Sequence, residues 1–149
     1  MNRINLKNER GFTMIEILLV MAIIAIVTTF SAVFYSRFLT QNAVANAADQ
    51  VAGQIQKARI YAMSGKQNSN WGVSFTSPIL TLYSGASYAA RNPSLDEKFR
   101  INSNVSVTGL LDLNIARATG VPGAVTTVTI SAGNNIKTVT INSQGMTNR

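Results

Sequence analysis

Few side chains in this sequence could perform catalysis. The chain of 149 residues contains no histidine and no cysteine, which excludes imidazole bases, thiolate nucleophiles, disulfides and cysteine-based zinc sites. The remaining candidates are the six carboxylates Glu9, Glu16, Asp49, Asp96, Glu97 and Asp112. Only Asp96 and Glu97 are adjacent, and the Pro-Ser-Leu segment before them indicates a solvated turn rather than an acid/base pair. We therefore expect no enzyme activity, no cofactor and no bound metal.

Glu16 has the most unusual surroundings of these carboxylates, because no further charge follows it before Arg37. A carboxylate that faces lipid near a helix end is unfavourable, by up to about 2.5–3.5 kcal/mol at the bilayer centre, so Glu16 requires a partner. Thr13-x-x-Glu16 has the form of a capping box, in which each side chain bonds the backbone of the other residue. That local role does not exclude a second partner on another chain.

The residues after Glu16 belong to a predicted membrane-spanning helix. Residues 17–36 are uncharged and contain neither Pro nor Gly. A helix of that length, at about 1.5 Å per residue, spans about 30 Å of bilayer core. We assign residues 12–38 to this transmembrane helix. The simpler alternatives are a buried helix of a soluble protein and a plain membrane anchor.

The charges that flank the apolar run predict its orientation. Arg3, Lys7 and Arg10 precede the run, whereas Arg37 stands alone just after it. The positive-inside rule then places the N-terminus in the cytoplasm and the rest of the chain outside, as in a single-pass protein of the cytoplasmic (inner) membrane. An ordinary cleaved secretory signal is a competing interpretation, although its apolar region is usually shorter, about 7–15 residues.

A pattern of apolar residues continues the helix beyond the membrane segment. These residues recur every three or four positions and form one stripe: Val44, Ala48, Val51, Ile55, Ala58 and Ala62. No Pro interrupts the chain, so one helix is predicted from Thr13 to about Met63, with Gly65 as its C-terminal stop. Residues 39–65 thus form an amphipathic continuation that lays its stripe on a domain.

Residues 66–149 show strand patterns. Apolar and polar residues alternate around Val73, Leu80, Phe99 and Val105, and the sequence TVTI occurs twice, with a Gly-Asn-Asn turn signal between the copies. Such alternation predicts antiparallel strands with one face buried and one face in water. The predicted fold is therefore α+β. Its long N-terminal helix spans the membrane with its first half and packs its amphipathic second half on an antiparallel β-sheet, the globular domain 66–149.

The segment RGFTMIE at residues 10–16, together with the apolar run, resembles the processing site of type IV prepilins and type II secretion pseudopilins. Those families share a short basic leader that ends in Gly, then a Phe, a Glu four residues further on, and a long apolar run. The resemblance implies that residues 1–11 are a leader peptide, cleaved between Gly11 and Phe12 by a membrane aspartyl prepilin peptidase. It also implies N-methylation of the new Phe12 amine.

The same resemblance implies that Glu16 of an incoming subunit pairs with the Phe12 amine of a neighbour during assembly. Physical chemistry supports such a pair. At about 4 Å and an effective dielectric near 20, the attraction is about 4 kcal/mol before desolvation costs, so that the pair sets axial register more than it adds net stability. Gly11 has no side chain, and its backbone can enter a narrow protease site in an extended form.

Two further features point to a minor subunit of this family. Many major pilins carry a helix-bending Pro where this sequence has Val33, so we expect the helix to stay continuous. The segment 58–62, Ala-Arg-Ile-Tyr-Ala, and the terminal segment 139–145 resemble the minor pseudopilin H of type II secretion and related minor pilins. The simplest interpretation of Arg59 is a cation that closes the helix.

The sequence therefore predicts a minor pilin or pseudopilin, a structural subunit of a type IV pilus or a type II secretion pseudopilus. Its implied partners are the prepilin peptidase, other pilin or pseudopilin subunits, an inner-membrane assembly platform and membrane lipid. The alternative is a minor pilin that binds DNA for uptake, since the net charge is +7. The candidate contacts to nucleic acid are Lys98, Arg100, Arg117, Lys137 and Arg149. A solvated basic surface explains the same charges more simply.

Overall fold

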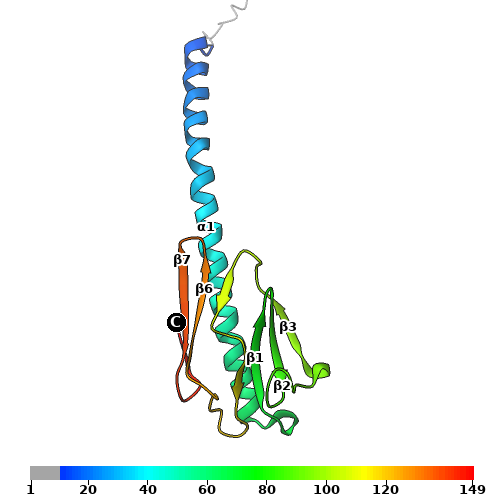
Figure 1. The fold of residues 1–149 in the computed structure, drawn as a ribbon. Coiled ribbons are helices and arrows are strands. Elements are labelled where there is room, and N and C mark those ends of the chain that lie inside the picture. The colour runs from blue at the N-terminus through cyan, green and yellow to red at the C-terminus, as the bar shows by residue number, and fades with distance from the viewer. Residues whose placement is uncertain (1–10) are drawn as a thin grey trace, which may run out of the picture. The chain divides into compact units, whose positions relative to one another are not determined.

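The computed structural model describes residues 11–149, leaving aside the side chains of residues 30–33. The predicted leader therefore lies outside the described residues, except for Gly11. The chain divides into two compact units, Met1–Phe38 and Leu39–Arg149. A single helix, α1 (Met14–Met63), runs through both, as predicted (Figure 1). The helix stays continuous at Val33, where no Pro bends it.

After α1 the chain forms two short 3₁₀ helices and eight strands (Figure 1). The elements are η1 (Lys66–Asn68), β1 (Trp71–Thr76), β2 (Ile79–Ser84), η2 (Pro93–Leu95), β3 (Glu97–Arg100), β4 (Ser106–Thr108), β5 (Leu113–Ile115), β6 (Thr126–Ala132), β7 (Asn135–Ile141) and β8 (Thr147–Asn148). The helix ends where predicted, because Gly65 adopts a left-handed conformation (φ 65°, ψ 25°) that other residues disfavour.

The strands form two four-stranded antiparallel sheets, in the orders β3-β2-β1-β5 and β4-β6-β7-β8. The predicted α+β class is confirmed, and the predicted hairpin is β6–β7, with Ala132 opposite Asn135 at its turn. The prediction of one sheet is corrected to two. Strands β5 and β8 were not predicted, because three and two residues are too few to show an alternating pattern.

The part of α1 from Leu39 onward covers the inner faces of both sheets. All six residues of the predicted stripe are buried, and they join side chains of both sheets in one hydrophobic core. Ala47 and Ala52 widen the stripe, and their small side chains let the helix approach the strands closely. The amphipathic prediction for this part of the helix is therefore confirmed at the level of individual residues.

The prediction that each strand has one face in water is wrong for β1 and β2. Ser74 and Tyr83, on the outer face, are both buried. Segments outside the sheet cover this face: the Ser74 hydroxyl donates to the carbonyl of Leu111 at 2.6 Å, and the Tyr83 hydroxyl donates to Asp112. In contrast, β6 alternates buried and more exposed residues as predicted.

Candidate assembly site

The first turn of α1 contains the predicted capping box. The backbone N–H of Thr13 donates to Oε2 of Glu16, and the backbone N–H of Glu16 donates to the Thr13 hydroxyl, both at 3.4 Å. These bonds are long for N–H···O contacts, and both side chains remain exposed. The local role of Glu16 is thus confirmed as geometry, while its carboxylate stays accessible to a further partner.

The residues of the predicted cleavage site lie beside this carboxylate. Gly11, Phe12, Thr13 and Glu16 line one open cavity of about 330 Å³. Phe12 is 80% exposed, and a Cβ added at Gly11 would meet nothing within 4 Å. The peptide bond between Gly11 and Phe12 is therefore open to a protease, and cleavage there would place a new amine at the edge of the same cavity.

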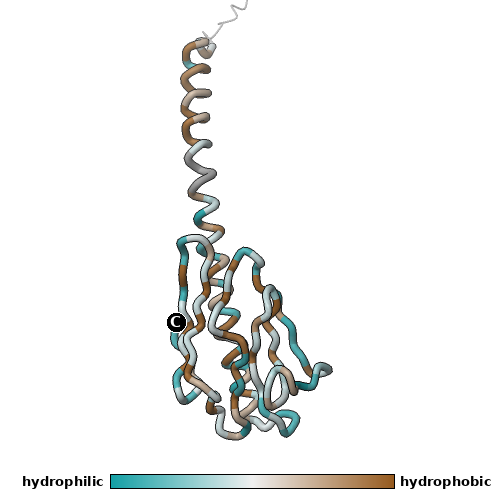
Figure 2. The backbone as a smooth tube through the Cα atoms, viewed as in Figure 1, coloured by the Kyte–Doolittle hydropathy of each residue, from teal (hydrophilic) through white to brown (hydrophobic). Residues whose placement is uncertain are grey.

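The helix that follows exposes apolar side chains in every direction. Ile15, Leu18, Met21 and Val27, which point to different sides of the helix, are all more than half exposed, and hydrophobic residues dominate this part of the tube in Figure 2. Within the described residues, α1 is the one helix long and apolar enough to cross a membrane. So much exposed apolar surface requires lipid or other apolar helices around it.

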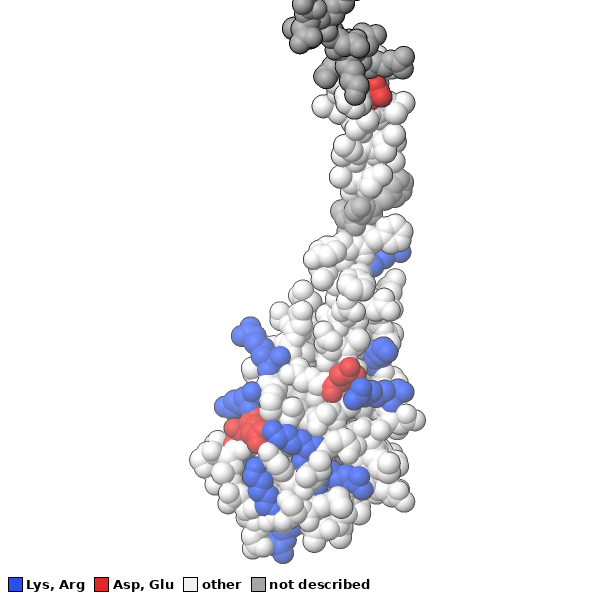
Figure 3. All heavy atoms as spheres, turned by 180° about the vertical axis from the view of Figure 1, so that it is seen from behind, with Lys and Arg blue, Asp and Glu red and all other residues white. Residues whose placement is uncertain are grey.

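The five candidate nucleic-acid contacts are not gathered in one place. Lys98 and Arg100 are exposed on β3, and Lys137 is exposed on β7 of the other sheet. Arg117 donates to the backbone and side-chain oxygens of Asn68, and Arg149 pairs with Asp49 at 2.5 Å. In Figure 3, Lys and Arg side chains are dispersed over the visible face of the domain.

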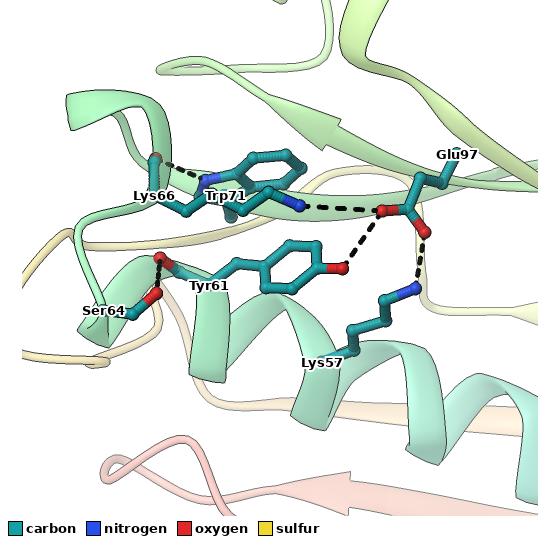
Figure 4. A network of polar contacts seen from close by, with 6 residues as sticks. All are labelled: Lys57, Tyr61, Ser64, Lys66, Trp71 and Glu97. Carbon is teal, nitrogen blue, oxygen red and sulfur yellow. Dashed lines mark hydrogen bonds and ion pairs between the residues drawn. The ribbon is translucent and has the colours of Figure 1, made fainter.

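A network of polar contacts around Glu97, whose side chain is partly exposed, was not predicted. Its carboxylate accepts from Lys57 at 2.5 Å and from the Tyr61 hydroxyl at 3.2 Å, and Lys66 lies at 4.0 Å (Figure 4). The Lys66 ammonium also lies 3.5 Å from the centre of the Tyr61 ring. The only sequence signal was the i, i+4 spacing of Lys57 and Tyr61, which places them on one helix face.

The neighbouring Asp96 is also different from its prediction. Its side chain is only 2% exposed and pairs with Arg91 at 2.9 Å, so the interpretation of Asp96 and Glu97 as a solvated turn is wrong. The two carboxylates leave the chain in opposite directions, as successive residues at the start of a strand do. Asp96 pairs with Arg91, whereas Glu97 pairs with Lys57.

The Glu97 network predicts a pH-dependent stability. Hydrogen bonding to Lys57 lowers the pKa of Glu97 from 4.5 and raises that of Lys57 from 10.5. A lowered carboxylate pKa stabilises the fold above the unfolded value and loses that effect as the pH falls through the folded value. The raised Lys57 pKa preserves the interaction up to high pH. The stabilisation is therefore present between about pH 4.5 and 10.5.

We expect Glu97→Gln to lower the free energy of unfolding at pH 7 by about 0.5–1 kcal/mol, because both partners are about one-third exposed. The difference from wild type should shrink towards zero as the pH falls below 4.5. Denaturant unfolding of the full chain in detergent, followed by circular dichroism between pH 3 and 8, measures it. A difference that is the same at every pH would show that the charge is irrelevant.

A comparison with known protein families finds a match at the start of α1. A family model described as the prokaryotic N-terminal methylation motif matches residues 6–32, which include Gly11, Phe12 and Glu16. Neither the search of curated proteins nor the search of solved structures finds a match. The match covers only the N-terminal segment, and together with a helix long and apolar enough to cross a membrane it indicates a type IV pilin-like protein. It implies processing by a prepilin peptidase and assembly with other pilin subunits.

Proposed function

We propose that this chain is a minor pilin or pseudopilin, a non-enzymatic structural subunit of a type IV pilus or a type II secretion pseudopilus. The observation that carries the proposal is the start of α1. An accessible carboxylate and the predicted cleavage site share one cavity, directly before a helix whose exposed surface is apolar. A plain membrane anchor requires the apolar helix but neither of the other two features.

The capping box suggests how Glu16 is held before assembly. In the unassembled subunit the carboxylate has a local partner, the Thr13 amide at 3.4 Å. Capping interactions contribute about 1 kcal/mol, less than the attraction expected from a charged amine at close range. The methylated Phe12 amine of a neighbouring subunit can therefore replace the local bond, so that Glu16 changes partners on incorporation at little cost.

The proposed topology follows from the flanking charges. Arg3, Lys7 and Arg10 stay in the cytoplasm and the domain 66–149 faces the other side of the inner membrane. Prepilin peptidase then acts on the cytoplasmic side, where the bond between Gly11 and Phe12 lies. From this position an inner-membrane assembly platform transfers the mature subunit from the lipid to the filament, where neighbouring apolar helices replace lipid.

The mass of the mature N-terminus tests the proposal. We expect the chain, isolated from membranes that contain a prepilin peptidase, to begin at Phe12 and to carry one methyl group on its amine. Gly11→Val should abolish cleavage, because a branched side chain cannot enter a narrow site in extended form. Intact-mass spectrometry of both proteins measures the result. A wild-type chain that keeps its first eleven residues would reduce α1 to a plain anchor.

DNA binding is the second candidate function. It is favoured by Lys98 and Arg100, two exposed cations on the edge strand β3, which could contact successive phosphates. Arg117 and Arg149, in contrast, already bond to groups of the chain itself. The structural role therefore has the stronger support.

A further inference from the structure

Arg59 occupies an unusual position on α1. It precedes the last turn of the helix, which contains no basic residue, so it does not close the helix as the sequence suggested. Two glycines pack against its side chain instead. A Cβ added at Gly120 would lie 3.3 Å from Arg59 Cγ, and a Cβ added at Gly145 would lie 3.2 Å from Cδ and 3.3 Å from Nε.

Both glycines have positive φ angles, 68° at Gly120 and 75° at Gly145, a conformation that side-chain-bearing residues disfavour. Gly120 belongs to the loop after β5, and Gly145 to the turn between β7 and β8. Two turns from different sheets thus meet over one arginine. Gln56, one turn earlier on α1, holds the second turn in place by donating to the Thr147 hydroxyl at 3.0 Å.

The guanidinium held in this way has no ionic partner within residues 11–149. Its Nε is buried without a hydrogen bond, and the ion pairs of these residues all join other side chains. The four carboxylates of residues 39–149 already bond to other groups: Asp49, Asp96, Glu97 and Asp112. A buried donor without an acceptor is costly, but an outside group cannot reach Nε itself. It is the unpaired charge of the guanidinium that is suited to an anion from outside the chain.

Four apolar residues lie next to Arg59 in the chain or next to the groups that contact it. Ile60 and Met63 follow it on α1, Val121 follows Gly120, and Met146 follows Gly145. These four side chains are between 46% and 63% exposed, and Met63 also contacts Gly120, since a Cβ there would lie 2.6 Å from Met63 Cγ. We name these four residues and Arg59 the Arg59 patch.

We propose that the Arg59 patch docks an acidic, otherwise apolar segment of another pilin-type subunit, with a carboxylate of that segment on the Arg59 guanidinium. The proposal rests on the proposed function. Charge complementarity supports it, because residues 12–149 carry ten Lys and Arg but only five Asp and Glu, and the carboxylates of residues 39–149 already have partners within the chain. A desolvated ion pair inside an apolar rim is the arrangement of an interface hot spot.

The variant Arg59→Met distinguishes a role of Arg59 in docking from a role in the stability of the fold. Met keeps the apolar stem but removes the unsatisfied donor. We therefore expect the full chain in detergent to unfold at the wild-type temperature or above, and cleavage after Gly11 to be normal. Incorporation into filaments should fall about tenfold or more. Arg100→Met, at an exposed cation without an apolar rim, is the matched control and should assemble normally.

Crosslinking identifies the occupant without changing Arg59. A photo-reactive amino acid at Ile60, in cells that assemble the filament, should crosslink to a peptide that contains Asp or Glu and belongs to a subunit with its own methylation motif. The same probe at Leu111, which is 85% exposed outside the patch, should not. Exchanging Arg59 for Glu should block assembly, and replacing the crosslinked acid with Arg should restore it.

Several results would overturn the inference: normal incorporation of Arg59→Met, a crosslink at Ile60 to lipid or nucleic acid, or a crosslinked segment without an acid. If Arg59→Met fails to fold, the crosslink from Ile60 in the otherwise unchanged chain tests the inference instead. A wild-type chain found in filaments, combined with any of these results, refutes only the Arg59 patch. A wild-type chain that is neither cleaved nor found in filaments refutes the proposed function, and the patch proposal falls with it.

Discussion

Glu16→Gln should almost abolish incorporation into filaments while leaving membrane insertion and the helix start unchanged. Gln retains the side-chain oxygen that accepts from the Thr13 amide, and it is an accepted member of the capping box. It removes only the negative charge. If the charge pairs with a neighbour's amine, an attraction of about 4 kcal/mol before desolvation is lost, which corresponds to a large change in assembly.

Thr13→Ala provides the opposite change. It removes the hydroxyl that accepts from the Glu16 amide and weakens the helix start by about 1 kcal/mol, but it keeps the charge. We expect this variant to assemble nearly as well as wild type. Both variants are measured by the fraction of the chain in sheared filaments relative to the membrane fraction. Efficient assembly of Glu16→Gln together with failure of Thr13→Ala would show that capping is the only role of Glu16.

Gly72→Ala should destabilise the β domain strongly, although it adds only one methyl group. A Cβ at Gly72 would lie 2.4 Å from Tyr83 Cζ and 2.7 Å from the backbone oxygen of Leu113. The Tyr83 ring cannot move away easily, because its hydroxyl donates to Asp112 and its ring packs on Tyr88 with centroids 5.7 Å apart. Burial also raises the pKa of the Tyr83 hydroxyl, so Tyr83 remains a neutral donor.

Overpacking costs about 1–3 kcal/mol, and because neither neighbour can move away easily we expect the upper end of this range, a fall in the unfolding temperature of about 10 °C. Gly53→Ala is the matched control, since Gly53 lies exposed in α1 and an added Cβ would meet nothing within 4 Å. That variant should gain about 1 kcal/mol of stability. Thermal unfolding of both full-length variants in detergent gives the comparison. Equal effects of the two substitutions would show that the contact at Tyr83 is not tight.

Short-range features could be predicted from the sequence because their signals lie within one or two turns. The stripe from Val44 to Ala62 repeats every three or four residues, Gly65 ends the helix, and the β6–β7 hairpin has a turn signal between two alternating segments. The processing motif is of the same kind. Its residues are adjacent, and the methylation-motif match covers them. Their assembly roles remain predictions.

Long-range features could not be predicted. Glu97 bonds to Lys57 across forty residues, and Arg59 lies against Gly120 and Gly145, separations at which no periodicity connects one residue to another. The covering of Ser74 by the segment around Leu111 belongs to the same class. Because each of these contacts depends on how the loops of both sheets close over α1, an excess of cations in the sequence could not show which cations find a partner within the chain.

The sequence by itself thus determined the long apolar helix, the methylation motif and the α+β class, since each depends on residue type and local spacing. Only the tertiary structure decided which charged side chains form ion pairs. It also decided that Arg59 packs against Gly120 and Gly145 without an ionic partner among the described residues. The physical reason is that an ion pair or a buried donor depends on distance in space, and burial is set by the packing of segments that are remote in the chain.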